Sequence, residues 1–165
     1  MLPALHYNKK TDPEAFWIQA DGLRLPFKEA GFDIVFSKGV MFQIADWEMF
    51  VSGLCNLSKN HVLFNFKGTN GVTLADTAKS FQYLTPAIKI PLVFIAMDDM
   101  VAHLRKIPFC RNVEIHYADM DFTKFGNSPV RQGFAADVHV FIDKNRAVDS
   151  LPKITIYKTK QVLEW

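Results

Sequence analysis

The stretch PLVFIAMDDMVAHLRKIP, residues 91–108, decides the fold class that the sequence predicts. Residues 91–97 form a nearly unbroken apolar run of strand length, which is typical of a strand buried on both faces. Acidic residues begin the next segment and basic residues end it, an order that suits the dipole of a helix closed by Pro108. This pattern indicates the middle of a βαβαβ segment with a parallel sheet.

The segments before this stretch are predicted to alternate between helices and strands. We expect a short first helix from Asp12 and Pro13 to Gly22, because proline suits the first helical position. Strands over residues 32–36 and 40–44 are predicted to pair through a tight hairpin. A helix is predicted after Asp46, since apolar residues recur there at three- and four-residue intervals.

Two further patterns complete the expected fold. Residues 62–67 are predicted to form a strand, and the spacing of Thr73 and Asp76 as a capping pair predicts a helix from Thr73 to about Leu84. In the last third, residues 113–122, 137–143 and 154–159 alternate apolar and polar side chains, as antiparallel strands with one solvated face do. The predicted class is α+β with an α/β-like centre, in a single globular domain over residues 1–165. Its mixed sheet is parallel in the middle and antiparallel towards the C-terminus, with helices packed on it.

Composition and charge exclude several classes of protein. The 165 residues are 49% hydrophobic and include 15 Phe and 3 Trp, so neither disorder nor a need for disulfide bonds is expected. Nineteen Lys and Arg residues against 17 Asp and Glu residues leave a net charge of +2, which gives no reason to propose a polyanionic partner. Without a recognisable secretory signal or a span of bilayer length, we expect a cytoplasmic protein that has no contact with membranes.

Two of the alternating segments carry candidate site residues. If residues 113–122 and 137–143 pair as antiparallel strands, His116 and His139 share the polar face and come within reach of each other. Acidic residues lie on the same face: Glu114, Asp137 and Asp143. Since two imidazoles and a carboxylate are the ligand set of a facial-triad metal centre, we take His116, His139 and Asp137 as candidate ligands of a divalent metal. An ordinary solvent-facing sheet surface explains the same pattern.

Other candidate sites have simpler explanations. The turn at residues 68–73 follows a strand, as a phosphate-binding turn does, but it lacks the lysine and the glycine spacing of the known motifs. Asp98 and Asp99 follow a strand at a common ligand position, but capping of the next helix is the preferred interpretation. Cys110 could be a nucleophile with His103 as base, but an inert thiol and a solvated histidine are the preferred interpretations.

No catalytic constellation or cofactor motif is recognisable, and the aromatic content is high. The sequence therefore predicts a non-catalytic module that binds a protein partner or a second copy of itself through an aromatic-rich surface. One alternative is a small metal-dependent or acid–base enzyme that uses His116, His139 and a neighbouring carboxylate. A second is nucleic-acid binding through the basic C-terminal strands, where Lys153 and Lys158 lie, although lysines that protect an edge strand explain those charges.

Overall fold

The computed structural model describes residues 2–69, 71–76, 81–85, 88–108, 110, 112–119, 135–144 and 153–158. The helices within these ranges are α1 (Leu2–Thr11), α2 (Trp47–Leu57) and α3 (Met97–Lys106), with a short 3-10 helix η1 (Met41–Gln43). The main sheet contains β1 (Phe32–Ser37), β2 (Ser58–Thr69), β5 (Ile95–Ala96), β6 (Asn112–Asp119), β7 (Ala135–Asp143) and β8 (Lys153–Lys158). A separate pair consists of β3 (Phe81–Thr85) and β4 (Ile88–Pro91).

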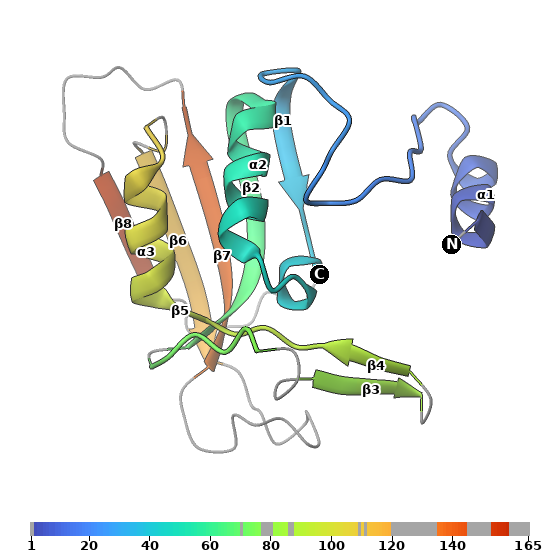
Figure 1. The fold of residues 1–165 in the computed structure, drawn as a ribbon. Helices are drawn as coiled ribbons and strands as arrows, with labels where there is room; N and C mark the ends of the chain where they lie inside the picture. The colour runs from blue at the N-terminus through green and yellow to red at the C-terminus, as the bar shows by residue number, and fades with distance from the viewer. Residues whose placement is uncertain are drawn as a thin grey trace.

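The main sheet is mixed and has the strand order β1-β2-β7-β6-β8. Strands β1 and β2 run parallel, and β5 pairs in parallel with the end of β2. Strand β7 is antiparallel to both of its neighbours, while β8 is parallel to β6. Helices α2 and α3 lie on the same face of this sheet (Figure 1). The predicted α+β class with a mixed sheet is confirmed, and β6 and β7 are antiparallel as expected; the last strand, β8, was expected to be antiparallel and is parallel to β6 instead.

The hydrophobic core fills the space between the sheet and these two helices. Alternate residues of β2 point into it, and Val62, Phe64 and Phe66 are 0%, 2% and 0% exposed. The residues between them point to the opposite side of the sheet, as the period of two in a strand requires. Strands β6 and β7 and helices α2 and α3 also contribute buried residues to this core: Val113, Ile115, Val138, Val140, Ile142, Phe50, Val51, Leu54, Met100 and Leu104.

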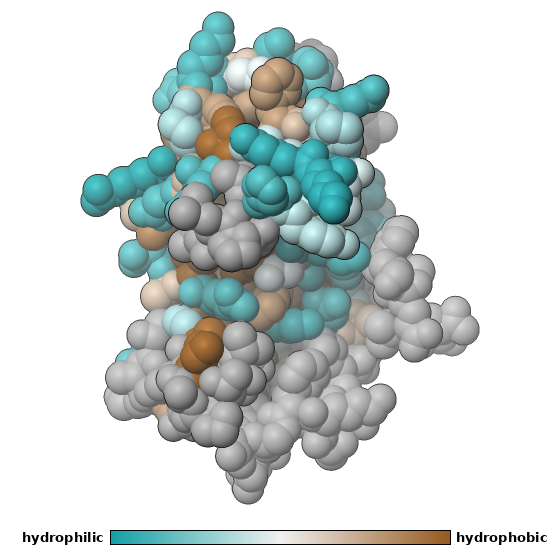
Figure 2. Space-filling view, turned by 90° about the vertical axis from the view of Figure 1, so that its right-hand side faces the viewer, coloured by the Kyte–Doolittle hydropathy of each residue, from teal (hydrophilic) through white to brown (hydrophobic). Residues whose placement is uncertain are grey.

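Strand β1 stands at one edge of the main sheet, and β8 stands at the other, within the described residues. The β1 side chains Phe32, Ile34 and Phe36 are 40%, 59% and 67% exposed, whereas Val35 packs against the core. Figure 2 views the molecule from the side of β1 and shows apolar residues at the surface among hydrophilic ones. The expected exposure of aromatic residues is thus found on β1, whereas Trp47 is buried.

Two expectations about local structure are wrong in the first half of the chain. Residues 12–22 do not form the expected helix; the first helix spans Leu2–Thr11, and Pro13 follows its end. Residues 40–44 do not form the second strand of a hairpin, since Met41–Gln43 is a 3-10 helix. Strand β1 pairs with β2 instead, and the fully buried Met41 accounts for the apolar pattern.

The middle of the chain corrects two further expectations. The helix predicted from Thr73 to about Leu84 is wrong, because Leu74 forms a bridge with Phe94 and residues 81–85 form β3. Burial of the segment after Pro91 is confirmed, since residues 92–96 are at most 6% exposed. Its placement as a central strand is wrong, because only Ile95 and Ala96 pair with β2.

No helix in the described ranges is both long enough and apolar enough to cross a membrane.

Candidate functional site

The carboxyl ends of the parallel strands form one end of the sheet. Ser37 of β1 is aligned with Phe64 of β2, and β2 continues to Gly68 and Thr69, where β5 pairs with it. This end lies at the bottom of Figure 1, next to the loops that follow β1 and β2. In open α/β sheets ligands bind outside the carboxyl ends of the strands, so a ligand site is expected among the residues at this end.

The turn after β1 is held close to β2 by one side chain. Gly39 has a φ of +70°, a conformation that glycine adopts without strain. Its N–H donates a hydrogen bond of 2.8 Å to Oδ1 of Asn65. Among the described residues, a Cβ atom on Gly39 would meet the ring of Phe42, at 4.0 Å, and nothing closer, so these residues leave open space beside the turn. The turn therefore offers an accessible stretch of backbone with a fixed position.

A second turn is attached to the start of α3 through the hydroxyl of Thr73. The N–H of Ala96 donates to Thr73 Oγ1 at 2.8 Å, and Thr73 Oγ1 donates to Asp99 Oδ2 at 2.5 Å. The residue before the first turn of α3 is Ala96, and it makes no side-chain capping bond. Asp98 and Asp99 thus lie in the first turn of the helix and do not cap it, in contrast to the preferred interpretation of the sequence.

Backbone hydrogen bonds join the loops at this end into one unit. Val93 donates to the carbonyl of Phe42 at 2.6 Å, and Leu74 and Phe94 exchange two bonds of 2.7 and 3.0 Å. Leu92 and Phe94 form a small apolar cluster with Phe42 and Leu74. The carboxyl end is therefore built from three loop segments that share their own small core.

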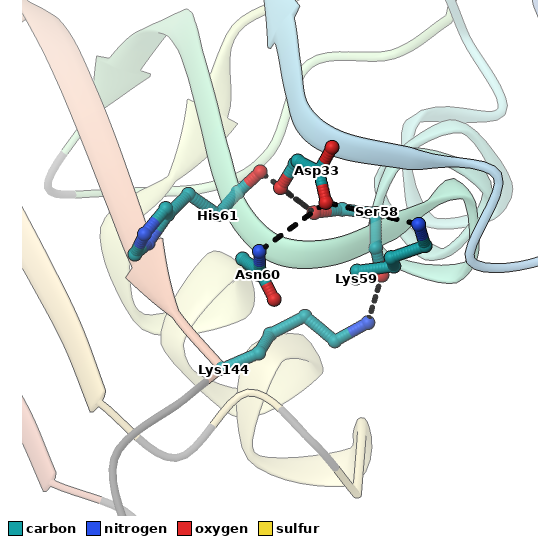
Figure 3. Close-up of polar contacts among 6 residues, drawn as sticks. All are labelled: Asp33, Ser58, Lys59, Asn60, His61 and Lys144. Atoms are coloured by element: carbon teal, nitrogen blue, oxygen red, sulfur yellow. Dashed lines mark hydrogen bonds and ion pairs between the residues drawn. The ribbon is translucent and has the colours of Figure 1, made fainter.

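The amino ends of β1 and β2 are closed by polar contacts (Figure 3). The ammonium group of Lys144 donates to the carbonyl of Cys55 at 3.0 Å and to that of Ser58, which satisfies carbonyls at the end of α2. The hydroxyl of Ser58 lies near the carbonyl of Asp33 at 3.3 Å and that of His61 at 2.7 Å. These contacts bond side chains to the backbone of neighbouring elements, so we assign them a structural role.

His103 was expected on a solvated surface, and this expectation is wrong, because the residue is only 9% exposed. Its Nε2 lies 3.1 Å from Ser52 Oγ and its Nδ1 lies 3.7 Å from Glu48 Oε1. Burial lowers the pKa of His103, although Glu48 opposes this effect. The imidazole therefore joins α2 to α3. Its position three residues after the buried Met100 is a signal that could have predicted this burial.

The two cysteines lie side by side in the core near the amino end. Their sulfur atoms are 3.4 Å apart, and both residues are fully buried. The hydrogen bond with Cys110 and burial both raise the pKa of the Cys55 thiol. Cys110 is fully buried, so a substrate in solvent cannot reach its sulfur, which supports the interpretation of Cys110 as inert.

The structure brings the predicted histidines together. His116 and His139 are directly opposed in the β6–β7 ladder, on the face of the sheet away from α2 and α3. Asp137 lies on the same face, where its carboxylate is 3.3 Å from Lys67 Nζ and 3.7 Å from His139 Nε2. Although burial raises the pKa of Asp137, its contacts with His139 and Lys67 hold that pKa below its usual range. Among the described residues, no group of three or more His, Cys, Asp or Glu side chains is placed to hold a metal ion.

Comparison with known proteins bears on the first part of the chain. A family model described as a methyltransferase domain matches residues 1–64 of the 165 residues. The match covers α1, β1, η1, α2 and the beginning of β2, and it includes the turn at Gly39. No curated protein matches the chain.

This match overturns the prediction of a non-catalytic protein-binding module, because a methyltransferase domain is catalytic. The prediction was wrong because it relied on the absence of a recognisable group of reactive side chains in the sequence. In enzymes whose cofactor carries the chemistry, the protein supplies binding and orientation, much of it from the backbone. A protein partner or self-association stays a prediction.

Proposed function

We propose that the chain takes part in methyl transfer, and that the carboxyl end of β1 forms part of the site. One observation carries the proposal: the residues similar to a methyltransferase domain contain the β1–α2 unit and the start of β2. They therefore include the turn at Gly39, where an open α/β sheet would hold a ligand. Thr73 and Asp99, which lie outside the matched residues, border the same end.

The methyl group would come from a sulfonium donor such as S-adenosylmethionine, which supplies an electrophilic carbon when bound. The open space beside Gly39 fits the approach of such a molecule to the backbone. No two glycines of the chain are separated by one residue, so the glycine spacing with which a strand–helix turn holds a nucleotide is missing. The described residues thus fit one edge of a donor site and do not form the whole of it.

The contribution of this chain is to hold that edge in place. Asn65 fixes the turn through the N–H of Gly39, and Met41, which is 0% exposed, anchors the next segment in the core. Thr73 and Asp99 hold the neighbouring loop against α3. Such fixed backbone positions orient a ligand with little loss of conformational entropy. We regard Asn65 as a positioning residue, since it acts through Gly39.

Ligand-detected NMR tests the proposal because it reports weak binding. Saturation transfer from the protein to S-adenosylhomocysteine, the demethylated form of the donor, is expected for the wild-type chain. Gly39→Val should reduce it strongly, since a β-branched side chain is strained at this φ and fills the open space. Asn65→Ala should reduce it less, and Asn60→Ala at the amino end should leave it unchanged.

Circular dichroism of each variant establishes that it is folded before binding is compared. Two results would overturn the proposal. One is the absence of transfer to the wild-type chain, and the other is equal transfer to wild type and to the folded Gly39 and Asn65 variants.

A further inference from the structure

The face of the sheet opposite α2 and α3 carries a pair of histidines that methyl transfer at Gly39 does not use. We call this face the open face; Asn65, Lys67, His116, Asp137 and His139 lie on it. His116 and His139 are direct partners in an antiparallel ladder, and such partners have Cβ atoms about 4.5–5.5 Å apart. Their side chains are 42% and 39% exposed, so an ion can reach both rings from solvent.

Neighbouring groups hold each imidazole in place. His116 Nε2 lies 3.4 Å from Glu114 Oε2, and His139 Nε2 lies 3.7 Å from Asp137 Oδ2. A carboxylate beside one ring nitrogen favours the tautomer whose other nitrogen is free to bind a metal. The ring of Tyr157 stacks on His116 with centroids 4.7 Å apart and planes inclined by 18°, which limits rotation of that imidazole.

The remaining acids on this face are engaged elsewhere. Asp137 contacts Lys67 at 3.3 Å and accepts a hydrogen bond of 3.4 Å from Asn65 Nδ2. Asp143 lies 3.6 Å from Nδ1 of His61. In the part of the chain that the structure describes, no third ligand joins the two imidazoles. Imidazole suits nickel, copper and zinc, whereas magnesium and calcium prefer oxygen ligands.

We propose that His116 and His139 form a binding site for a divalent transition-metal ion of the nickel, copper and zinc class. Water fills the other coordination positions, and Asp137 orients His139 without binding the ion. A bound ion joins β6 to β7 across the open face. The site uses other residues than the proposed donor edge, and Asn65 links the two: its Oδ1 accepts a hydrogen bond from the N–H of Gly39, and its Nδ2 donates to Asp137 beside His139.

Thermal unfolding of the full chain, treated with a chelator and then titrated with nickel chloride, tests this site. The melting temperature should rise with nickel and approach saturation, because the ion binds the folded chain by mass action. The double variant His116→Ala, His139→Ala should lose that rise. His61→Ala is the matched control, since His61 lies on the same face beside Asp143, and it should keep the rise.

Calorimetric titration with nickel provides a second readout that does not depend on stability. We expect about one ion per chain. His116→Gln and His139→Gln each remove one of the two imidazole ligands, so the affinity for nickel should fall at least about tenfold in each variant. Magnesium should give no comparable signal. Equal nickel binding by wild type and the double variant would mean adventitious binding elsewhere and would overturn the site, as would no binding by wild type.

Discussion

The two ends of the parallel strands β1 and β2 are built in different ways. At the amino end, the ammonium group of Lys144 donates hydrogen bonds to the carbonyls of Cys55 and Ser58. The buried side chains of Cys55 in α2 and Cys110 after α3 are also in contact there. At the carboxyl end, loops hold one another through backbone bonds, and Gly39 leaves open space beside its turn. The amino end is thus held by side-chain contacts, whereas the carboxyl end is held by backbone bonds and a small core of its own and carries the exposed turn at which we propose that a ligand binds.

Phe94→Ala should have the largest effect on the carboxyl end. Phe94 is 1% exposed and anchors the small cluster with Leu92, so its removal should lower the free energy of unfolding by about 3–5 kcal/mol. Urea denaturation measures this change. Phe16→Ala is the control, because Phe16 is 98% exposed and should change stability by less than about 0.5 kcal/mol. Equal effects would show that the loops of this end have no core of their own.

Gly68→Ala tests how closely β2 packs at the same end. A Cβ atom there would lie 2.5 Å from Val138 Cγ2 and 3.2 Å from Met97 Sδ, so we expect a loss of about 1–3 kcal/mol from overpacking. Gly71→Ala is a matched control, since no atom of the described residues lies within 4 Å of its added Cβ. Denaturation curves of the two variants that coincide would contradict the close packing.

Thr73→Ala should have a smaller effect. The change removes the acceptor of the Ala96 N–H and the donor to Asp99, and it should cost about 1 kcal/mol in urea unfolding. Asp99→Asn keeps a hydrogen-bond acceptor and should cost less. If Thr73→Ala is as stable as wild type, the hydroxyl does not hold the second turn against α3.

The smallest expected effect is a pH dependence at the contact between α2 and α3. Because burial lowers the pKa of His103 from 6.5, the unfolded chain binds a proton at higher pH than the folded chain does. The stability contributed by neutral His103 is therefore complete above about pH 6.5 and is lost as the pH falls towards the lowered pKa. His103→Gln should weaken this pH dependence in urea unfolding, and the exposed His6→Gln should not. An unchanged dependence in His103→Gln would contradict the burial argument.

Strong periodicity made much of the fold predictable. Residues 62–67 and the apolar stripe after Trp47 gave β2 and α2, because their buried residues follow one period throughout. The predictions for residues 40–44 and 73–84 were wrong because the local sequence pattern of each segment fits more than one secondary structure. Contacts with distant segments of the chain decide which structure forms. Met41 is a buried residue of a 3-10 helix, and Leu74 bridges to Phe94.

The site was only partly predictable for a related reason. Alternation alone placed His116 and His139 on one face, and the observed register then made them direct partners. The turn at Gly39 was not predicted as a site, because it would contact a ligand through its backbone. Motifs of side chains do not reveal such backbone contacts. His103 was misjudged because a histidine beside Arg105 was taken as solvated, although its helical spacing from Met100 places it in the core.

Chemical-shift mapping of the backbone amides tests the central claim most directly, because it compares the two ends in one experiment. Addition of S-adenosylhomocysteine should shift the amide signals of Lys38, Gly39 and Phe42 at the carboxyl end of β1 in a saturable way. The signals of Lys59 and Asn60 at the amino end should stay in place. Shifts confined to the amino end, or no saturable shift at Gly39, would contradict the assignment of ligand binding to the carboxyl end.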